Sequence, residues 1–156
     1  MLVGSAAIGT SSPHQAGLML LTRLYESRYG QPIPAIRVTP RGKPFFQDSP
    51  VHFSISHTKT QVFCVLSDRP VGIDAEDLDR PIRLELAEKI LSPTEISYYE
   101  QSRDKRDTLL RFWVLKEAAA KCSGEGLRGY PNHTDFSPKD SRIRVMDHCY
   151  VAIIED

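Results

Sequence analysis

Several features that mark large classes of protein are missing from this sequence or scarce in it. The three cysteines, Cys64, Cys122 and Cys149, form no CxxC pair, and an odd, sparse set of this kind indicates reduced thiols rather than disulfides. We therefore expect a cytoplasmic protein. No apolar run approaches the ~20 residues that a membrane-spanning helix needs, so we expect no membrane partner.

Charge of one sign is not in excess either. The chain carries 20 basic and 20 acidic side chains, whereas a general nucleic-acid-binding protein shows a basic excess. We therefore expect no nucleic-acid partner. The opening residues 1–12 are apolar and small but lack the basic segment of a signal peptide, and they predict a frayed or weakly ordered start.

What the sequence does contain is a succession of helical and extended patterns, in a chain of 156 residues that fits one compact unit. Apolar residues at helical spacing predict a helix over 14–29, ended by Gly30. Alternation over 51–57, followed by a second apolar run after a short turn, predicts a hairpin. Further strands are predicted at 35–39, 70–76 and 142–156, and helices at 79–91, 92–101 and 104–123. This order indicates an α+β fold.

Two carboxylates stand two residues apart in the strand-like run VGIDAEDLD. Residues i and i+2 of a strand face the same side, so the side chains of Asp74 and Glu76 converge. Hard oxygen ligands at this spacing suit Mg²⁺, which usually shares its coordination with substrate phosphates. A solvated acidic turn would give the same pattern, so the motif needs support from elsewhere in the chain.

The predicted helix over 104–123 supplies that support. Trp113, Glu117 and Lys121 recur at every fourth residue and form a stripe along one side of the helix. Glu117 offers a third carboxylate to the metal, and Lys121 lies one turn further on as a partner for an anion. An ordinary surface pair of Glu117 and Lys121 is the plain alternative.

Two more segments carry groups suited to a phosphate ligand. His57 ends a strand and enters the turn of the predicted hairpin, and Ser56 beside it offers a hydroxyl and a backbone N–H. Lys43 lies on a loop, within the segment GKP. Taken alone, each of these side chains fits an ordinary solvated surface position equally well.

Together and in this order, the segments resemble the 4′-phosphopantetheinyl transferase superfamily. The matching text, from about Arg41 to Leu127, consists of RGKPFF, HFSISHT, VGIDAED, LSPTE and FWVLKEAAAKCSGEGL. Each motif is weak by itself, whereas five motifs in register with compatible spacings are specific.

The resemblance implies a fold. Small trimeric members of the family carry the GID motif at the N-terminus, but here about seventy residues precede it, as in the two-lobed type. We therefore expect a 4′-phosphopantetheinyl transferase-like α+β fold in a single transferase unit, with pseudo-symmetric lobes over 1–67 and 68–156, each a small antiparallel sheet packed on helices. The N-terminal lobe is expected to be shortened, and the family's first strand to be missing or replaced. A monomer is expected rather than a trimer, with a dimer as an open alternative.

The resemblance also implies an activity. The 4′-phosphopantetheine arm of coenzyme A would be transferred to a serine of an acyl or peptidyl carrier protein or domain, with release of 3′,5′-ADP and with Mg²⁺, or Mn²⁺ in its place. Carriers of fatty-acid, polyketide and nonribosomal-peptide synthesis are all open as partners. A degenerate family member that binds coenzyme A or a carrier without transfer is one alternative. A metal-dependent phosphatase or pyrophosphatase is another, but it leaves the histidine and lysine motifs unexplained.

Finally, the resemblance implies roles for individual residues. The metal would be held by Asp74, Glu76 and Glu117. Coenzyme A would be contacted by Lys43, Ser56, His57 and Lys121. The catalytic set would consist of Glu117, Lys121, His57 and Glu95, in which Glu117, or Glu95 through a water, would deprotonate the carrier serine.

Overall fold

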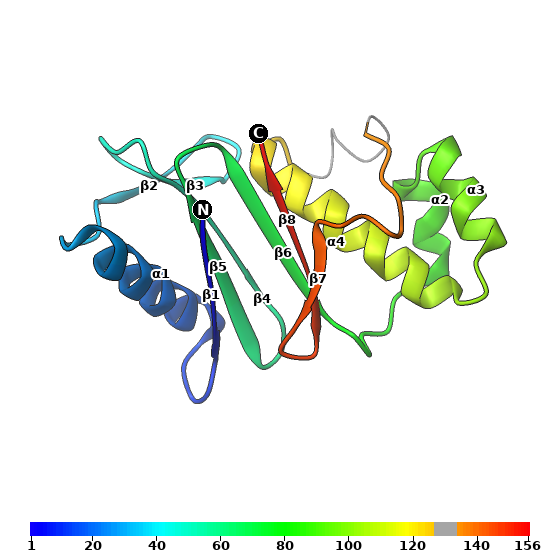
Figure 1. Cartoon of the computed structure of the whole chain (residues 1–156), viewed down its shortest axis with the longest axis horizontal. Coiled ribbons are helices and arrows are strands. Elements are labelled where there is room, and N and C mark those ends of the chain that lie inside the picture. Colours follow the sequence, from blue (N-terminus) through cyan, green and yellow to red (C-terminus); the bar gives the residue numbers. More distant parts are fainter. Residues whose placement is uncertain (127–133) are drawn as a thin grey trace.

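The computed structural model describes residues 1–126 and 134–156, so that Leu127, the end of the last matching motif, lies outside the described residues. Two three-stranded antiparallel sheets lie side by side, with α1 at one end and α2–α4 at the other, and a two-stranded ribbon, β2–β3, is separate from both (Figure 1). The strands are β1 Leu2–Ala7, β2 Ile36–Val38, β3 Pro44–Phe46, β4 His52–His57, β5 Gln61–Ser67, β6 Val71–Asp77, β7 Ile143–Met146 and β8 Cys149–Glu155. The helices are α1 Pro13–Tyr29, the 3₁₀ turn η1 Leu84–Leu86, α2 Ala87–Ile90, α3 Pro93–Gln101 and α4 Lys105–Ser123. The α+β fold expected from the sequence is confirmed.

The first sheet has the strand order β1-β5-β4 and contains an element that the sequence did not predict. The opening segment forms β1, which pairs antiparallel with β5 along its whole length, so the prediction of a frayed start was wrong. Its small residues have little strand preference of their own, and pairing with β5 supplies the hydrogen bonds that order them. Gly4 also lets α1 pack closely, because a Cβ there would lie 2.9 Å from Leu24 Cδ2.

Local signals define α1, which covers this sheet. The Ser12 hydroxyl accepts a hydrogen bond from the Gln15 N–H, and the Gln15 side chain accepts one from the Ser12 N–H in return. Gly30 ends the helix in the left-handed conformation, with φ 66°. The predicted helix over 14–29 is therefore confirmed. The hairpin of β4 and β5 is confirmed too, whereas the short ribbon of β2 and β3 was predicted only in its first strand.

The second sheet has the order β6-β8-β7, and α4 packs against it. A close approach at Gly72 fixes this packing: a Cβ there would lie 2.0 Å from the Ala118 carbonyl oxygen and 2.4 Å from the Cys122 nitrogen. Only glycine lets the backbone of β6 come so near to the last turns of α4. The strand that carries Asp74 and the helix that carries Glu117 are thereby brought together.

The helices between β6 and α4 are shorter than the pattern indicated. The helix predicted over 79–91 is limited to η1 and one turn of α2. The helix predicted over 92–101 is confirmed as α3, with Ser92 as its N-cap. α4 begins after the cap Asp104 and ends at Gly124, with φ 73°, as its alanines and long side chains predicted.

The two sheets meet where β4 lies beside β6 (Figure 1). A short link over residues 68–70 connects β5 directly to β6. The two strands that this link connects contribute fully buried side chains to one hydrophobic cluster, among them Phe63, Val65, Val71 and Ile73. The division into lobes at 67/68 follows this link and stays a prediction.

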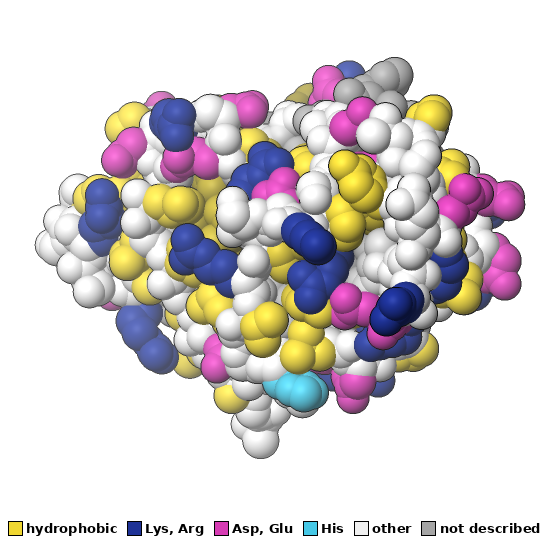
Figure 2. All heavy atoms as spheres, turned by 45° about the vertical axis from the view of Figure 1, so that its right-hand side comes forward, with side chains coloured by type: hydrophobic (Ala, Val, Ile, Leu, Met, Phe, Trp, Pro, Cys, Tyr) yellow, Lys and Arg dark blue, Asp and Glu magenta, His cyan; other side chains and the backbone are white. Residues whose placement is uncertain are grey.

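The face of the molecule drawn in Figure 2 carries Lys and Arg side chains interspersed with Asp and Glu side chains and apolar patches. No helix in the described part of the chain is long and apolar enough to cross a membrane.

Candidate active site

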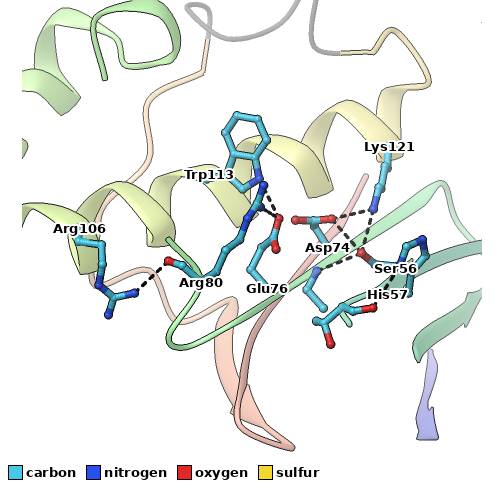
Figure 3. Close-up of polar contacts among 10 residues, drawn as sticks. Ser56, His57, Asp74, Glu76, Arg80, Arg106, Trp113 and Lys121 are labelled. Carbon is cyan, nitrogen blue, oxygen red and sulfur yellow. Dashed lines mark hydrogen bonds and ion pairs between the residues drawn. The ribbon is translucent and has the colours of Figure 1, made fainter. Parts of the chain in front are cut away.

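Asp74 and Glu76 leave the same face of β6 and point toward α4, from which Trp113 and Lys121 point back toward them (Figure 3). The period of two along the strand explains why both carboxylates lie on this side. The period of α4 explains why its stripe faces them. The structure thus brings together the strand motif and the helix motif that the sequence singled out.

Asp74 is almost completely buried, with 5% of its surface exposed. Its Oδ1 accepts a hydrogen bond of 2.9 Å from the Ser56 hydroxyl and one of 2.7 Å from Lys121 Nζ. Its Oδ2 is buried without a hydrogen-bond partner among the described residues. A buried carboxylate oxygen without a partner is costly, so one more cationic or donor group at Asp74 Oδ2 would stabilise the site.

Glu76 is held in a similar way by a different pair of donors. Its Oε1 accepts hydrogen bonds from the Arg80 guanidinium and, at 3.1 Å, from Trp113 Nε1. Arg106 anchors the Arg80 segment by donating to the carbonyl oxygens of Leu78, at 2.8 Å, and Arg80, at 3.2 Å. The contact with Arg80 was not foreseen from the sequence: the two residues are four apart, but Glu76 lies in a strand that ends at Asp77, and a spacing of four predicts a contact only within a helix.

Glu117 completes the set of carboxylates around one cavity of about 290 Å³. Burial raises the pKa of Glu117, and the charge of Asp74 raises it further, against the opposing effects of Lys121 and Arg80. We call this space the carboxylate cavity; its lining comprises Ile55, Ser56, His57, Asp74, Ala75, Glu76, Trp113, Glu117 and Lys121.

The donor set of this cavity agrees with a hard divalent cation in its chemistry. Asp74 has a buried oxygen without a partner among the described residues, and the pKa of Glu117 is raised by burial first and by the charge of Asp74 second. A cation would relieve both conditions. However, no group of three or more His, Cys, Asp or Glu side chains within residues 1–126 and 134–156 is arranged to hold a metal ion.

A second cavity, of about 280 Å³, adjoins the first and shares Ile55, Glu117 and Lys121 with it. Its remaining lining comes from the loop before β3, from β4 and from the end of α4. Lys43 lies here and donates a hydrogen bond to the Cys122 carbonyl oxygen at the C-terminal end of α4. Burial lowers the pKa of Lys43. Arg41, on the same loop, pairs with Glu125 at 3.5 Å.

His57 and Ser56, the other predicted ligand contacts, end β4 at the rim of the carboxylate cavity. His57 is exposed, and its Nδ1 lies 3.3 Å from the Thr58 carbonyl oxygen. Ser56 is buried at 5% exposure and points into the polar cluster rather than toward solvent. The two neighbours therefore differ in how easily a ligand reaches them.

Glu95 is the one predicted site residue that the structure does not bring to this group. It is completely buried, and it accepts hydrogen bonds from the Ser92 N–H at 2.8 Å and the Phe136 N–H at 2.9 Å. Lys116 Nζ forms an ion pair with Glu95 Oε2 at 2.7 Å. These contacts give Glu95 a structural role as the second half of the capping box of α3. The serine–x–x–Glu spacing is itself the signature of that box.

Comparison with known proteins agrees with the motifs. Residues 70–149 match the model of the 4′-phosphopantetheinyl transferase superfamily. The chain is 38% identical to the 4′-phosphopantetheinyl transferase Sfp of Bacillus subtilis strain 168 over 89 residues. These residues make up 55% of this chain and 39% of the relative. It is 32% identical over 116 residues to a 4′-phosphopantetheinyl transferase of Bacillus subtilis, covering 72% and 48%.

A third relative extends the match over most of the chain. The 4′-phosphopantetheinyl transferase psf-1 of Bacillus pumilus is 30% identical over 147 residues, which cover 89% of this chain and 63% of the relative. The chain thus spans 39% to 63% of the length of these three relatives. Because the family model covers more than half of the chain and includes β6, α4 and their carboxylates, the protein belongs to the 4′-phosphopantetheinyl transferase superfamily.

Proposed function

We propose that this protein transfers the 4′-phosphopantetheine arm of coenzyme A to a serine of an acyl or peptidyl carrier domain, with Mg²⁺ as cofactor. The observation that carries the proposal is the meeting of Asp74, Glu76, Glu117 and Lys121 around one cavity, which adjoins a second cavity lined by Lys43. Membership of the family supports the same reaction.

Mg²⁺ would be held by Asp74, Glu76 and Glu117, and when bound it supplies neutralisation of the charge that develops on the diphosphate. The partnerless Oδ2 of Asp74 supports this assignment. Glu76 would have to share its carboxylate between the metal and Arg80, since Arg80 already contacts its Oε1.

In the proposed reaction, the carrier serine oxygen forms a bond to the β-phosphorus of coenzyme A while the bond to the departing 3′,5′-ADP oxygen breaks. Glu117 takes the hydroxyl proton as the general base. Lys121 neutralises charge on the departing phosphate. Lys43 and His57, at the two ends of the site, would contact coenzyme A.

The test is incubation of the purified protein with coenzyme A, Mg²⁺ and apo carrier proteins of the fatty-acid, polyketide and nonribosomal-peptide types. A mass gain of one phosphopantetheine arm on a carrier, abolished by EDTA, is expected. Release of phosphate without carrier modification would instead support a phosphatase. Coenzyme A binding without either reaction would support a degenerate member that binds but does not transfer.

A further inference from the structure

The line along which the two sheets meet is held by serine side chains. No backbone pairing joins β4 to β6 in the described residues. Instead, the N–H of Ile73 donates to the Ser54 hydroxyl at 3.1 Å, and the N–H of Ala75 donates to the Ser56 hydroxyl at 3.2 Å. The spacing of two on both strands matches, so consecutive edge N–H groups of β6 each receive a partner.

Ser56 uses every hydrogen-bonding position of its hydroxyl within this protein. A serine hydroxyl has one donor and two acceptor positions. The Ser56 hydroxyl donates to Asp74 Oδ1 at 2.9 Å, and it accepts from the Ala75 N–H at 3.2 Å and from Lys121 Nζ at 3.1 Å. Figure 3 shows all three contacts converging on this one oxygen.

This saturation bears on the contact with coenzyme A that the resemblance implied for Ser56. A phosphate oxygen would need the only hydroxyl hydrogen, which Asp74 already takes. The side chain is also buried, so no second approach is open. A ligand hydrogen bond to this hydroxyl would therefore break the contact that orients Asp74.

We propose that Ser56 is a positioning residue, which orients Asp74 and does not contact coenzyme A through its side chain. This positioning role rests on the proposed function in one respect, namely that Asp74 binds the metal. By occupying Oδ1 together with Lys121, the Ser56 hydroxyl fixes the carboxyl so that Oδ2, buried and without a described partner, is left for the cation.

Ser54 provides a matched control within the same strand. Its hydroxyl makes the equivalent hydrogen bond to β6, but no hydrogen bond to Asp74 or Lys121 is found for it in the described residues. Both serines are buried to a similar degree, at 6% and 5% exposure. A Ser54→Ala variant therefore loses a hydrogen bond between the sheets but keeps the carboxylate of Asp74 in place. Ser56→Ala loses both the hydrogen bond between the sheets and the hydrogen bond to Asp74.

The experiment compares Mn²⁺ affinity, measured by electron paramagnetic resonance without coenzyme A or carrier, across the wild type and three variants. Ser56→Ala is expected to weaken Mn²⁺ binding by about tenfold, the lower end of the effect of losing a partner behind a metal ligand. Ser54→Ala should stay within about twofold of the wild type, by the same reasoning. Ser56→Thr, which keeps the hydroxyl, should recover most of the loss. Coenzyme A affinity, measured by calorimetry in EDTA, should be the same for Ser56→Ala as for the wild type.

Three results would overturn the positioning role: equal Mn²⁺ affinity of Ser56→Ala and Ser54→Ala, no Mn²⁺ binding by the wild type, or a loss of coenzyme A affinity in EDTA for Ser56→Ala. The carrier assay keeps this test apart from the proposed function. If the wild type modifies carriers but the two alanine variants bind Mn²⁺ equally, only the positioning role fails. If no carrier is modified but Ser56→Ala still loses Mn²⁺ affinity, the positioning role stands and the transfer proposal fails.

Discussion

Asp74 and Glu76 share a pattern that links their surroundings to their proposed task. Each carboxylate has one oxygen that accepts two hydrogen bonds, from Ser56 and Lys121 at Asp74 and from Arg80 and Trp113 at Glu76. Asp74 Oδ2 is buried without a hydrogen-bond partner among the described residues. Two donors on one oxygen restrict rotation of the carboxyl group, which prepares the other oxygen for a ligand before the ligand arrives.

The first prediction concerns the charge of Asp74. Asp74→Asn keeps the size of the side chain but removes the negative charge, so metal-dependent transfer should fall by at least about 100-fold, the size of a lost electrostatic contribution in an active site. The rate is measured as mass gain on a carrier protein. Asp79→Asn, an exposed position on the same segment, is the control and should keep wild-type activity. Transfer by Asp74→Asn within about threefold of the wild type would contradict the assignment, given that expected loss.

The second prediction concerns Lys121. Lys121→Met removes the cation that contacts Asp74 Oδ1 at 2.7 Å and that is proposed to stabilise the leaving phosphate. Transfer should slow by about 100-fold, while Mn²⁺ affinity is not weakened, because a positive charge beside the site is lost. Lys139→Met, at an exposed position, should change neither quantity. Unchanged transfer kinetics would make Lys121 a structural partner of Asp74 only.

At the scale of elements, the packing of α4 on β6 is what unites the site. The third prediction is that Gly72→Ala destabilises the protein by about 2 to 3 kcal/mol, since the new methyl group meets backbone atoms that cannot move alone. Transfer should also be lost in the folded fraction, because α4 carries Glu117 and Lys121. Urea unfolding measures the first effect. Gly4→Ala, where the methyl group meets only the flexible Leu24 side chain, should cost less; an equal cost would contradict the explanation.

The fourth prediction concerns a link between α4 and β8. Burial acts to raise the pKa of Asp107, but hydrogen bonds from Tyr150 and Arg111 outweigh it and hold the pKa below the ordinary value. Stability from this cluster is therefore present above the unfolded pKa of about 3.9 and is lost as the pH falls through the lower folded value. Asp107→Asn should lower the free energy of unfolding by about 1 kcal/mol at pH 7.

The pH dependence supplies the control for this cluster. The difference between Asp107→Asn and the wild type should shrink as the pH is lowered below about 4, because the wild-type carboxyl then becomes protonated as well. Urea unfolding at a series of pH values measures it. A difference that stays constant down to pH values where the carboxyl is neutral would show that its charge contributes nothing.

Elements with strong local signals could be predicted from the sequence, and elements that depend on distant partners could not. Ser12 and Gly30 define α1, and Ser92 and Gly124 mark one end of α3 and α4 respectively. By contrast, the small residues of β1 become a strand only through pairing with β5, a partner about sixty residues away in the chain.

The site divides in the same way. The period-two spacing on β6 and the period-four spacing on α4 placed Asp74, Glu76, Glu117 and Lys121 together in the prediction, and they line one cavity. The sequence could not show that Ser56 bridges Asp74 and Lys121, because these contacts join separate segments. The contact of Arg80 with Glu76 is local, but it forms where the chain leaves a strand, and no helical spacing applies there. For Glu95, the motif alone did not distinguish a catalytic position from the capping position that its hydrogen bonds with the Ser92 N–H and the Phe136 N–H indicate.

At the scale of the whole molecule, each of the three cysteines lies in a different hydrophobic cluster: Cys122 with α4, Cys64 with α1 and the first sheet, and Cys149 in the cluster between β5 and β6. All three are buried and unpaired. Burial raises the pKa of Cys64 to about 12 and, with the neighbouring Asp77, that of Cys149 to about 11, and burial raises the pKa of Cys122 as well. The nucleophilic thiolate is therefore scarce at neutral pH.

The fifth prediction follows from this burial. In the folded protein at pH 7 the three thiols should react with a disulfide reagent such as 5,5′-dithiobis(2-nitrobenzoate) only at the rate of unfolding, and in urea all three should react at once. Absorbance of the released thiolate measures both rates. Rapid reaction of one thiol in the native protein would show that the core is open at that point.

The site as a whole lies where the two sheets, their connecting serines and α4 meet, and the central claim is that a divalent cation and coenzyme A are held at this place. The most direct test is a crystal structure with coenzyme A and Mn²⁺, in which anomalous scattering locates the ion. The account predicts an ion in the carboxylate cavity, in contact with Asp74 Oδ2 and with the diphosphate of coenzyme A. An ion or a coenzyme A diphosphate bound elsewhere, with the carboxylate cavity filled only by water, would contradict it.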